Sequence, residues 1–338
     1  MIKRRYTMKR GIIINVVLMV LILVFAIISM NSGKMNLSPL EVLNVLIGNG
    51  TDKQNLIVFD FRLPRIVLSI LVGLGMGAAG VVMQSLLRND MASPGTLGIS
   101  SGSGLFVLFF VVFIASTGKS SFIALPLLAF VGGLLAAGLI FLLSYRRGRD
   151  ISPIGLILTG VALGSGYGAL TTFLTLKLDD SSQMNFMLYW LAGSLWGDDW
   201  GYISILTPWV LILLGYIFYK ARILNALHLG NQTAQGLGVS VKRQFLGLSI
   251  AAVALSSGSV AVGGSFFFVG LIAPHMARKL VGPDHKLLIP AASLAGGLVV
   301  VLADTITRTV SLVGDVPTGI VITVISVPYF LYLLAKAK

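Results

Sequence analysis

The residues that could carry out covalent or metal chemistry are few and do not form a recognisable group. The chain contains three histidines, His228, His275 and His285, and no cysteine. The spacing of the histidines does not match that of metal ligands on one helix face. The absence of cysteine excludes disulfides, thiolate metal sites and thiol nucleophiles. We therefore expect no catalytic residue, no metal site and no enzyme activity in this chain.

Two glycine-containing stretches resemble phosphate-binding loops but fail on spacing. Gly118-Lys119-Ser120 matches the end of such a loop, yet the first glycine that the motif requires falls at Phe113. The stretch from Gly98 to Gly104 lacks the dinucleotide-binding pattern and instead predicts the close-packed start of a helix. If ATP is used, we expect the ATPase to be a separate chain that binds ATP-Mg, with no cofactor bound here.

The segment from Ser265 to Ile289 mixes apolar and polar residues in a way that lipid could not accommodate. Its apolar run ends at Ala273, which is too short for a helix that crosses a bilayer. A span must therefore continue through Pro274, His275 and Arg278. Polar groups at that depth need partners from protein or water. We expect this segment to face protein or water and not lipid.

Composition places the whole chain among helical membrane proteins. Of its 338 residues, 56% are hydrophobic and only 11% are charged, and the mean hydropathy is +0.93. A soluble core of that apolarity would need a much larger protein, whereas lipid-facing helices need this balance. We predict an all-α, polytopic membrane protein.

Apolar runs predict ten spanning helices that form one transmembrane domain over residues 1–338. The first is a basic segment up to Arg10 followed by an apolar run over 11–30, which is too long for a signal peptide. The others are expected at 62–84, 95–115, 122–144, 152–176, 199–219, 243–262, 267–281, 287–306 and 317–335. Between the first two, residues 31–60 should lie outside and include a short interfacial helix.

Charge distribution supports an arrangement in which both termini are cytoplasmic. With ten spans, most of the 25 basic residues fall on the inner side, including Arg146, Arg147 and Arg149, and most of the 12 acidic residues fall outside. The net charge of +13 therefore reflects membrane topology. Nucleic acid is not an expected partner; the lipid bilayer is.

Small residues are repeated along the fifth span at helical spacing. Gly160, Gly164 and Gly168 form a ridge that is flanked by Ser165 and Thr171. Such ridges usually let helices pack closely. The alternative is that these small side chains leave room for a solute, so we keep them as candidate residues of a translocation path.

Several short motifs occur in a fixed order over most of the chain. They are Arg62-Leu-Pro-Arg65, Gly80 to Gln84, Ala92-Ser-Pro94, the segment Phe268 to Leu288 with Pro274, His275, Arg278, Asp284 and His285, Ala303-Asp304 with Arg308, and Pro317 to Ile320. In order and spacing these motifs resemble the FecCD-type permease family, the membrane subunits of ATP-driven importers for iron-siderophores, haem and vitamin B12.

The resemblance implies a set of partners and a loop that contacts one of them. The partners are a second permease subunit, identical or paralogous, two cytoplasmic ATPases and an extracytoplasmic substrate-binding protein. The ATPase coupling loop would span about 228–240. Its residues are Leu229, Gly230, Asn231, Gln232, Ala234, Gly236, Leu237, Gly238 and Val239. Relatives often have acidic residues where this chain has Asn231 and Gln232, so contacts there are expected to be hydrogen bonds.

The resemblance also assigns a role to three arginines at the outer ends of spans. Arg62, Arg65 and Arg308 match family positions that receive carboxylates from the binding protein. Arginine suits this role because its planar guanidinium binds a carboxylate through two hydrogen bonds. The alternative is that these side chains are interfacial anchors.

The expected function is the import of an iron-siderophore complex by alternating access, driven by partner ATPases. Haem or cobalamin import is the alternative within the family. Alternatives of other classes are an ion-coupled carrier, for which mid-span acids are scarce because Asp304 lies near an outer end, and a membrane-embedded enzyme.

Overall fold

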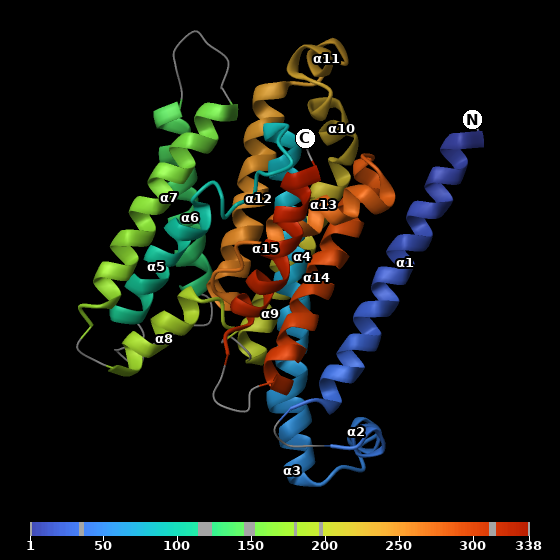
Figure 1. Cartoon of the computed structure of the whole chain (residues 1–338), viewed down its shortest axis with the longest axis vertical. Helices are drawn as coiled ribbons and strands as arrows, with labels where there is room; N and C mark the ends of the chain where they lie inside the picture. Colours follow the sequence, from blue (N-terminus) through green and yellow to red (C-terminus); the bar gives the residue numbers. More distant parts are fainter. Residues whose placement is uncertain are drawn as a thin grey trace.

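The computed structural model describes residues 2–33, 37–113, 124–144, 153–178, 181–195, 199–310 and 316–336. Arg146, Arg147 and Arg149, and the stretch from Gly118 to Ser120, lie outside these residues. Within them the chain is helical and has no strand (Figure 1). The helices are α1 (Ile2–Asn31), α2 (Pro39–Leu46), α3 (Asp52–Asn55), the π-helix η1 (Leu56–Arg62), α4 (Leu63–Leu87), α5 (Ile99–Phe113), α6 (Ala124–Ser144), α7 (Pro153–Thr175), α8 (Ser181–Leu191), α9 (Trp200–Tyr219), α10 (Ala221–His228), α11 (Asn231–Gly236), α12 (Val241–Gly263), α13 (Val269–Val281), α14 (His285–Val310) and α15 (Thr318–Lys336).

The ten predicted spans correspond to α1, α4, α5, α6, α7, α9, α12, α13, α14 and α15, so the all-α membrane fold is confirmed. Among the described residues, seven helices are long and apolar enough to cross a membrane. The remaining three, α5, α13 and α15, are shorter. A helix over Ser181–Leu191 (α8) was not predicted.

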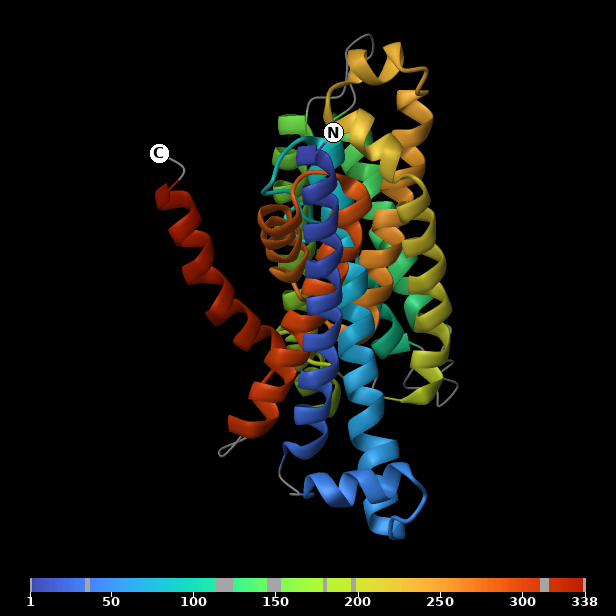
Figure 2. The same cartoon turned by 90° about the vertical axis from the view of Figure 1, so that its right-hand side faces the viewer.

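The two ends of the bundle differ in what they carry. Both termini and the short helices α10 and α11 lie at one end, which we call the inner end (Figure 1). Helices α2 and α3 lie at the opposite, outer end, where α2 runs across the axis of the bundle (Figure 2). This arrangement agrees with the predicted topology, in which an even number of spans places both termini on one side.

Helix α4 lies at the centre of the bundle and is mostly buried. Among the described helices, its most extensive packing is against α14. Glycines allow the two backbones to meet: a Cβ added at Gly73 would lie 2.4 Å from the Gly296 carbonyl oxygen, and one at Gly77 would lie 2.2 Å from the Ala292 carbonyl oxygen. Only glycine leaves room for backbones this close. The glycines therefore let α4 and α14 pack in direct backbone contact.

The predicted polar segment around Pro274 is α13, and it packs against α4 and α14 as expected. Gly80 of α4 sits beside the backbone of α13, where an added Cβ would lie 2.0 Å from the Gly270 carbonyl oxygen. The side chain of Gln84 donates a hydrogen bond to the Leu271 carbonyl oxygen at 3.2 Å. A polar side chain of α4 therefore donates a hydrogen bond to the backbone of α13 within the bundle.

The predicted short outer helix is α2, and it has one buried and one exposed apolar face. Val42 and Val45 are buried, whereas Leu40, Leu43 and Leu46 are exposed. A capping box starts the helix, since the Ser38 side chain accepts from the Glu41 backbone and Glu41 accepts from the Ser38 backbone.

Candidate functional site

The outer ends of α4 and α14 are joined by a buried carboxylate. Arg65 Nε lies 2.9 Å from Asp304 Oδ1, and Arg308 Nε lies 3.0 Å from Asp304 Oδ2. The side chain of Asp304 is only 1% exposed, and Thr318 of α15 donates to the same carboxylate at 3.3 Å. One aspartate therefore links three helices at the outer end of the bundle.

The same cluster includes α1 through two further contacts. Arg62 Nη1 donates to the Met30 carbonyl oxygen, and Arg308 Nη2 donates to Ser29 Oγ. Arg62 and Arg308 lie close enough for their charges to repel one another. Three arginines and one aspartate leave an excess of positive charge, which favours an anionic partner at this end. We call Arg62, Arg65, Asp304 and Arg308 the outer cluster.

The three arginines predicted from the sequence lie close together in the structure. Their guanidinium groups, however, bind residues of this same chain. Arg62 is 5% exposed, and the side chains of Arg65 and Arg308 are 25% and 16% exposed. Their docking role stays a prediction. The sequence reasoning missed Asp304 as their counter-ion, although its position four residues before Arg308 was a usable signal for a helical ion pair.

At the inner end, His285 joins α14 to α4 and α10. It is fully buried. Its Nδ1 lies 2.6 Å from Asn225 Oδ1, and its Nε2 is in contact with Ser85 Oγ. Because an amide oxygen only accepts, Nδ1 carries the proton and donates, so the Ser85 hydroxyl donates to Nε2. The imidazole ring of His285 therefore links α14 to both α4 and α10.

Neighbouring residues complete this inner contact. Asn225 Nδ2 donates to Asp284 Oδ1 at 2.9 Å, and Asp284 accepts from the Lys286 backbone at 3.1 Å, which caps the start of α14. Burial would raise the pKa of Asp284, but these hydrogen bonds and the Lys286 charge outweigh it and hold the pKa below its usual value. Asp284 is therefore a carboxylate at neutral pH. We call Ser85, Asn225, Asp284 and His285 the inner cluster.

Arg88 ties the end of α4 to the short inner helices. It ends α4 in a left-handed conformation with a φ of 48°. From there its Nε donates to the Leu227 carbonyl oxygen of α10 at 3.3 Å, and its Nη2 donates to Asn231 Oδ1 of α11. Asn231, predicted as a docking contact, thus has a partner inside the chain.

The predicted coupling loop is largely helical. Gly230 and Gly238 have φ values of 121° and 78° and flank α11. Ala234 is buried, whereas Leu229 and Leu237 are 68% and 66% exposed. Gln232 and Gly236 are also exposed and Val239 is half-buried. Leu229 and Leu237 thus expose apolar side chains at the inner end, one before and one after α11.

We expect Gly238→Ala to weaken coupling and Gly236→Ala to have little effect. A left-handed backbone costs alanine about 1–2 kcal/mol, so Gly238→Ala should distort the turn after α11. Gly236 lies in α11 with no heavy atom within 4 Å of an added Cβ. ATPase stimulation by loaded binding protein in liposomes measures the difference. Equal stimulation in the two variants would contradict a role for this turn.

Two of the three ridge glycines in α7 are packing sites. Gly160 and Gly164 face the start of α5, where added Cβ atoms would lie 2.8 Å from the Leu97 carbonyl oxygen and 2.7 Å from Gly98 Cα. Gly98 has a φ of 73° and precedes α5, which confirms the predicted close-packed helix start.

The other residues of the ridge have different surroundings. Nothing lies within 4 Å of an added Cβ at Gly168. Ser165 is exposed and bonds the Val161 carbonyl oxygen, while Thr171 is buried and bonds the Tyr167 carbonyl oxygen. Assignment of this ridge to a translocation path stays a prediction.

Leucine substitutions should separate packing from path positions in α7. We expect Gly160→Leu and Gly164→Leu to lower thermal stability, because each side chain would collide with backbone. Gly168→Leu should keep wild-type stability and lower uptake. Thermal unfolding in detergent and uptake in cells give the two readouts. A stable Gly168→Leu variant with full uptake would remove Gly168 from the path.

The motif residues of α13 lie between α4 and α15. Arg278 Nη2 lies 3.4 Å from Gln84 Oε1 and 3.5 Å from Asp90 Oδ1. The His275 ring lies 6.2 Å from the Tyr329 ring of α15. These contacts place Pro274, His275 and Arg278 in helix packing near the inner end.

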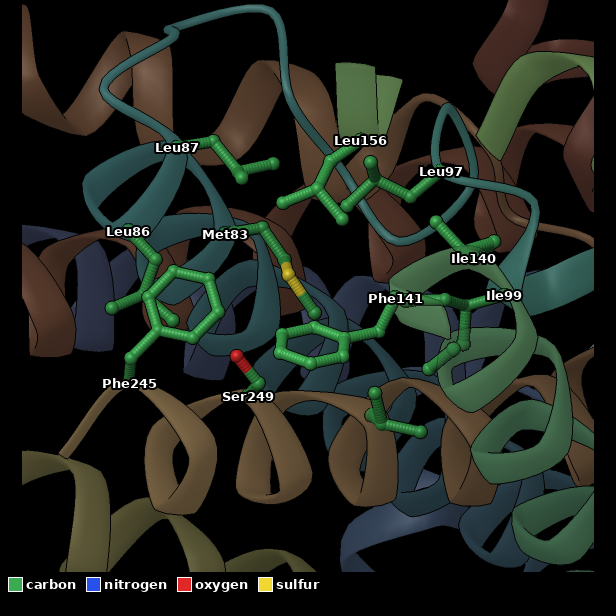
Figure 3. A pocket seen from close by; sticks show the side chains of 12 residues that line it. Met83, Leu86, Leu87, Leu97, Ile99, Ile140, Phe141, Leu156, Phe245 and Ser249 are labelled. Carbon is green, nitrogen blue, oxygen red and sulfur yellow. The ribbon is translucent and has the colours of Figure 1, made fainter. Parts of the chain in front are cut away.

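An apolar cavity lies between α4, α5, α6, α7 and α12 (Figure 3). Its volume is about 70 Å³, and Ser249 is its one polar side chain. Met83, Phe141 and Phe245 converge on it from three helices (Figure 3). Ligand pockets have volumes of roughly 300–1,000 Å³ and carry several polar groups. This cavity is therefore too small and too apolar for a metal chelate.

Comparison with known proteins decides the family. The model of the FecCD transport family matches residues 21–336. The chain belongs to this family. The iron(3+)-hydroxamate import system permease protein FhuG of Bacillus subtilis is 43% identical over 97% of this chain and 98% of its own length. The Fe(3+) dicitrate transport system permease protein FecD of Escherichia coli is 36% identical over 83% of this chain and 86% of its own length.

A solved structure agrees with this FecCD assignment. An inward-facing metal-chelate type ABC transporter matches with a TM-score of 0.81 and 28% identity, over 96% of this chain and 99% of that one. As a FecCD protein, the chain is a multi-pass permease subunit of an ABC importer in the cytoplasmic membrane, and it is not an enzyme. We assign the inner end of the bundle to the cytoplasmic side, as the distribution of basic residues predicts.

Proposed function

We propose that this permease translocates a ferric siderophore, of the hydroxamate class, into the cytoplasm. The support is the 43% identity over nearly the whole chain to a permease named for iron(3+)-hydroxamate import. Permeases named for Fe(3+)-citrate and achromobactin import are less similar, at 39% and 37% identity. Haem and cobalamin remain outcomes of the test.

The geometry supports a mechanical role at each end. The outer cluster carries excess positive charge, which suits carboxylates of a substrate-binding protein. The exposed leucines of the inner end suit a cytoplasmic ATPase, which would bind ATP-Mg on its own chain. A second permease subunit would complete the translocation path. ATP binding would then move the inner helices and open the translocation path between the two permease subunits alternately to each side.

Uptake in cells tests the substrate class. Cells that lack this permease should lose accumulation of radiolabelled iron supplied as a ferric hydroxamate, and the wild-type gene should restore it. Excess ferric citrate, haem or cobalamin should compete poorly. Restoration of haem or cobalamin uptake, with no effect on the ferric hydroxamate, would overturn the siderophore assignment.

A further inference from the structure

Helices α4 and α14 each reach both candidate sites of this permease. At the outer end, α4 contributes Arg65 and α14 contributes Asp304. At the inner end, α4 contributes Ser85 and α14 contributes His285. The same two helices are therefore linked to one another at both ends by polar contacts between buried or half-buried groups.

The two contacts are separated by nearly the same length on each helix. The two helices run in opposite directions, so Arg65 pairs with Asp304 and Ser85 pairs with His285. At a rise of 1.5 Å per residue, the contacts are separated by about 30 Å along α4 and about 28 Å along α14. The near-equal lengths allow a parallel-sided pair with a cross-link at each end.

Between the cross-links, the two helices meet backbone to backbone. A Cβ added at Gly296 would lie 2.2 Å from the Gly73 carbonyl oxygen, and one at Gly77 would lie 2.2 Å from the Ala292 carbonyl oxygen. Long side chains can change rotamer to absorb a sliding movement, but a backbone contact cannot. The centre of the pair therefore resists relative motion as well as its ends.

The inner end of this pair is attached to the cytoplasmic short helices. His285 of α14 contacts Asn225 of α10 at 2.6 Å. Arg88, at the end of α4, donates to the Leu227 carbonyl oxygen of α10 and to Asn231 of α11. A shift of the pair along its axis would consequently displace α10 and α11 with it.

We propose that α4 and α14 move as one rigid strut, which transmits docking of the binding protein at the outer cluster to the ATPase-facing helices α10 and α11. Asp304 and His285 are the positioning residues of this strut. The inference rests on the proposed docking and coupling roles of the two ends. The strut would be the physical connection between the two ends. A rigid element that contacts both sites moves both of them when it is displaced.

The strut makes docking depend on the nucleotide state, because coupling between two sites is reciprocal. The test measures how tightly the binding protein, loaded with a ferric hydroxamate, binds the complete transporter in nanodiscs. The affinity is measured with and without a non-hydrolysable ATP analogue. In the wild type, the two affinities should differ at least about fivefold. Ser85→Ala should reduce the ratio to below about twofold, because it removes the inner cross-link without touching the outer cluster.

Ser103→Ala is the matched control. Ser103 is also fully buried, and its hydroxyl bonds Ser257 Oγ at 3.0 Å, which joins α5 to α12 outside the strut. This variant should keep the wild-type affinity ratio. If Ser85→Ala kept the wild-type ratio, or if Ser103→Ala lost it equally, the strut would be overturned.

Gly77→Ala tests the centre of the strut independently. Its methyl group would push α4 from α14, whereas Gly138→Ala on α6 has open space and serves as its control. We expect Gly77→Ala to lose the difference in affinity between the two nucleotide states and Gly138→Ala to keep it. An assembled Gly77→Ala transporter with the wild-type ratio would contradict the strut.

A wild type that docks the binding protein equally in both nucleotide states would overturn the strut alone. Absence of any docking would overturn the proposed docking role as well.

Discussion

Asp304→Asn is expected to destabilise the permease by about 3 kcal/mol, because it leaves two arginines beside a buried position that no longer carries a negative charge. The carboxylate is 1% exposed and contacts both Arg65 and Arg308. Thermal unfolding of the purified permease in detergent measures the loss. Asp60→Asn is the control, since Asp60 is an exposed acid near the same end and should change stability little.

A double variant sharpens this prediction. Removing both members of an ion pair costs less than the sum of the single losses, so Asp304→Asn combined with Arg308→Gln should recover part of the stability. An Asp304→Asn protein that unfolds at the wild-type temperature would show that the outer cluster contributes nothing to the fold.

His285→Leu is expected to abolish transport while the protein still inserts into the membrane. The substitution removes the acceptor of the Ser85 hydroxyl, and an unsatisfied buried group costs about 1–3 kcal/mol. It also removes the contact between the imidazole ring and Asn225, while Asn225 keeps its hydrogen bonds to Asp284 and to the backbone of residue 285. We expect basal ATP hydrolysis by the assembled transporter to persist while stimulation by loaded binding protein falls at least about tenfold.

His275→Leu provides the comparison for this variant. His275 is half-buried, and its Nε2 has no hydrogen-bond partner among the described residues. The effect of its removal on stimulation should therefore be smaller. Equal losses in the two variants would indicate that any change in the α13–α14 region disrupts transport.

The spans were predictable because hydropathy and length are local properties of the sequence. The second span was expected at 62–84 and is α4, Leu63–Leu87. Even α13 was found despite its polar residues, because its apolar run is too short to cross a bilayer alone and the span had to continue through Pro274 and Arg278. Helix α8 was missed because its polar start, Ser181 to Gln183, gives no hydropathy signal.

The sites were predictable only in part, because their contacts join residues far apart in the chain. Arg62, Arg65 and Arg308 were given a role by resemblance, and Asp304 belongs to one of the same motifs, but its ion pairs with Arg65 and Arg308 were not predicted. In the inner cluster, Asn225 and Ser85 belong to no motif used here. Their partner His285 lies 60 and 200 residues away in sequence. Such contacts depend on which helices pack, and hydropathy does not specify that.

The central claim is that this chain is a ferric siderophore permease driven by separate ATPases. The most direct measurement is iron accumulation in liposomes that contain the two permease subunits and their ATPases, with binding protein loaded with a ferric hydroxamate outside. We predict accumulation that requires ATP inside and that is unaffected when a proton gradient is abolished. Accumulation driven by a proton or sodium gradient without ATP would contradict the account.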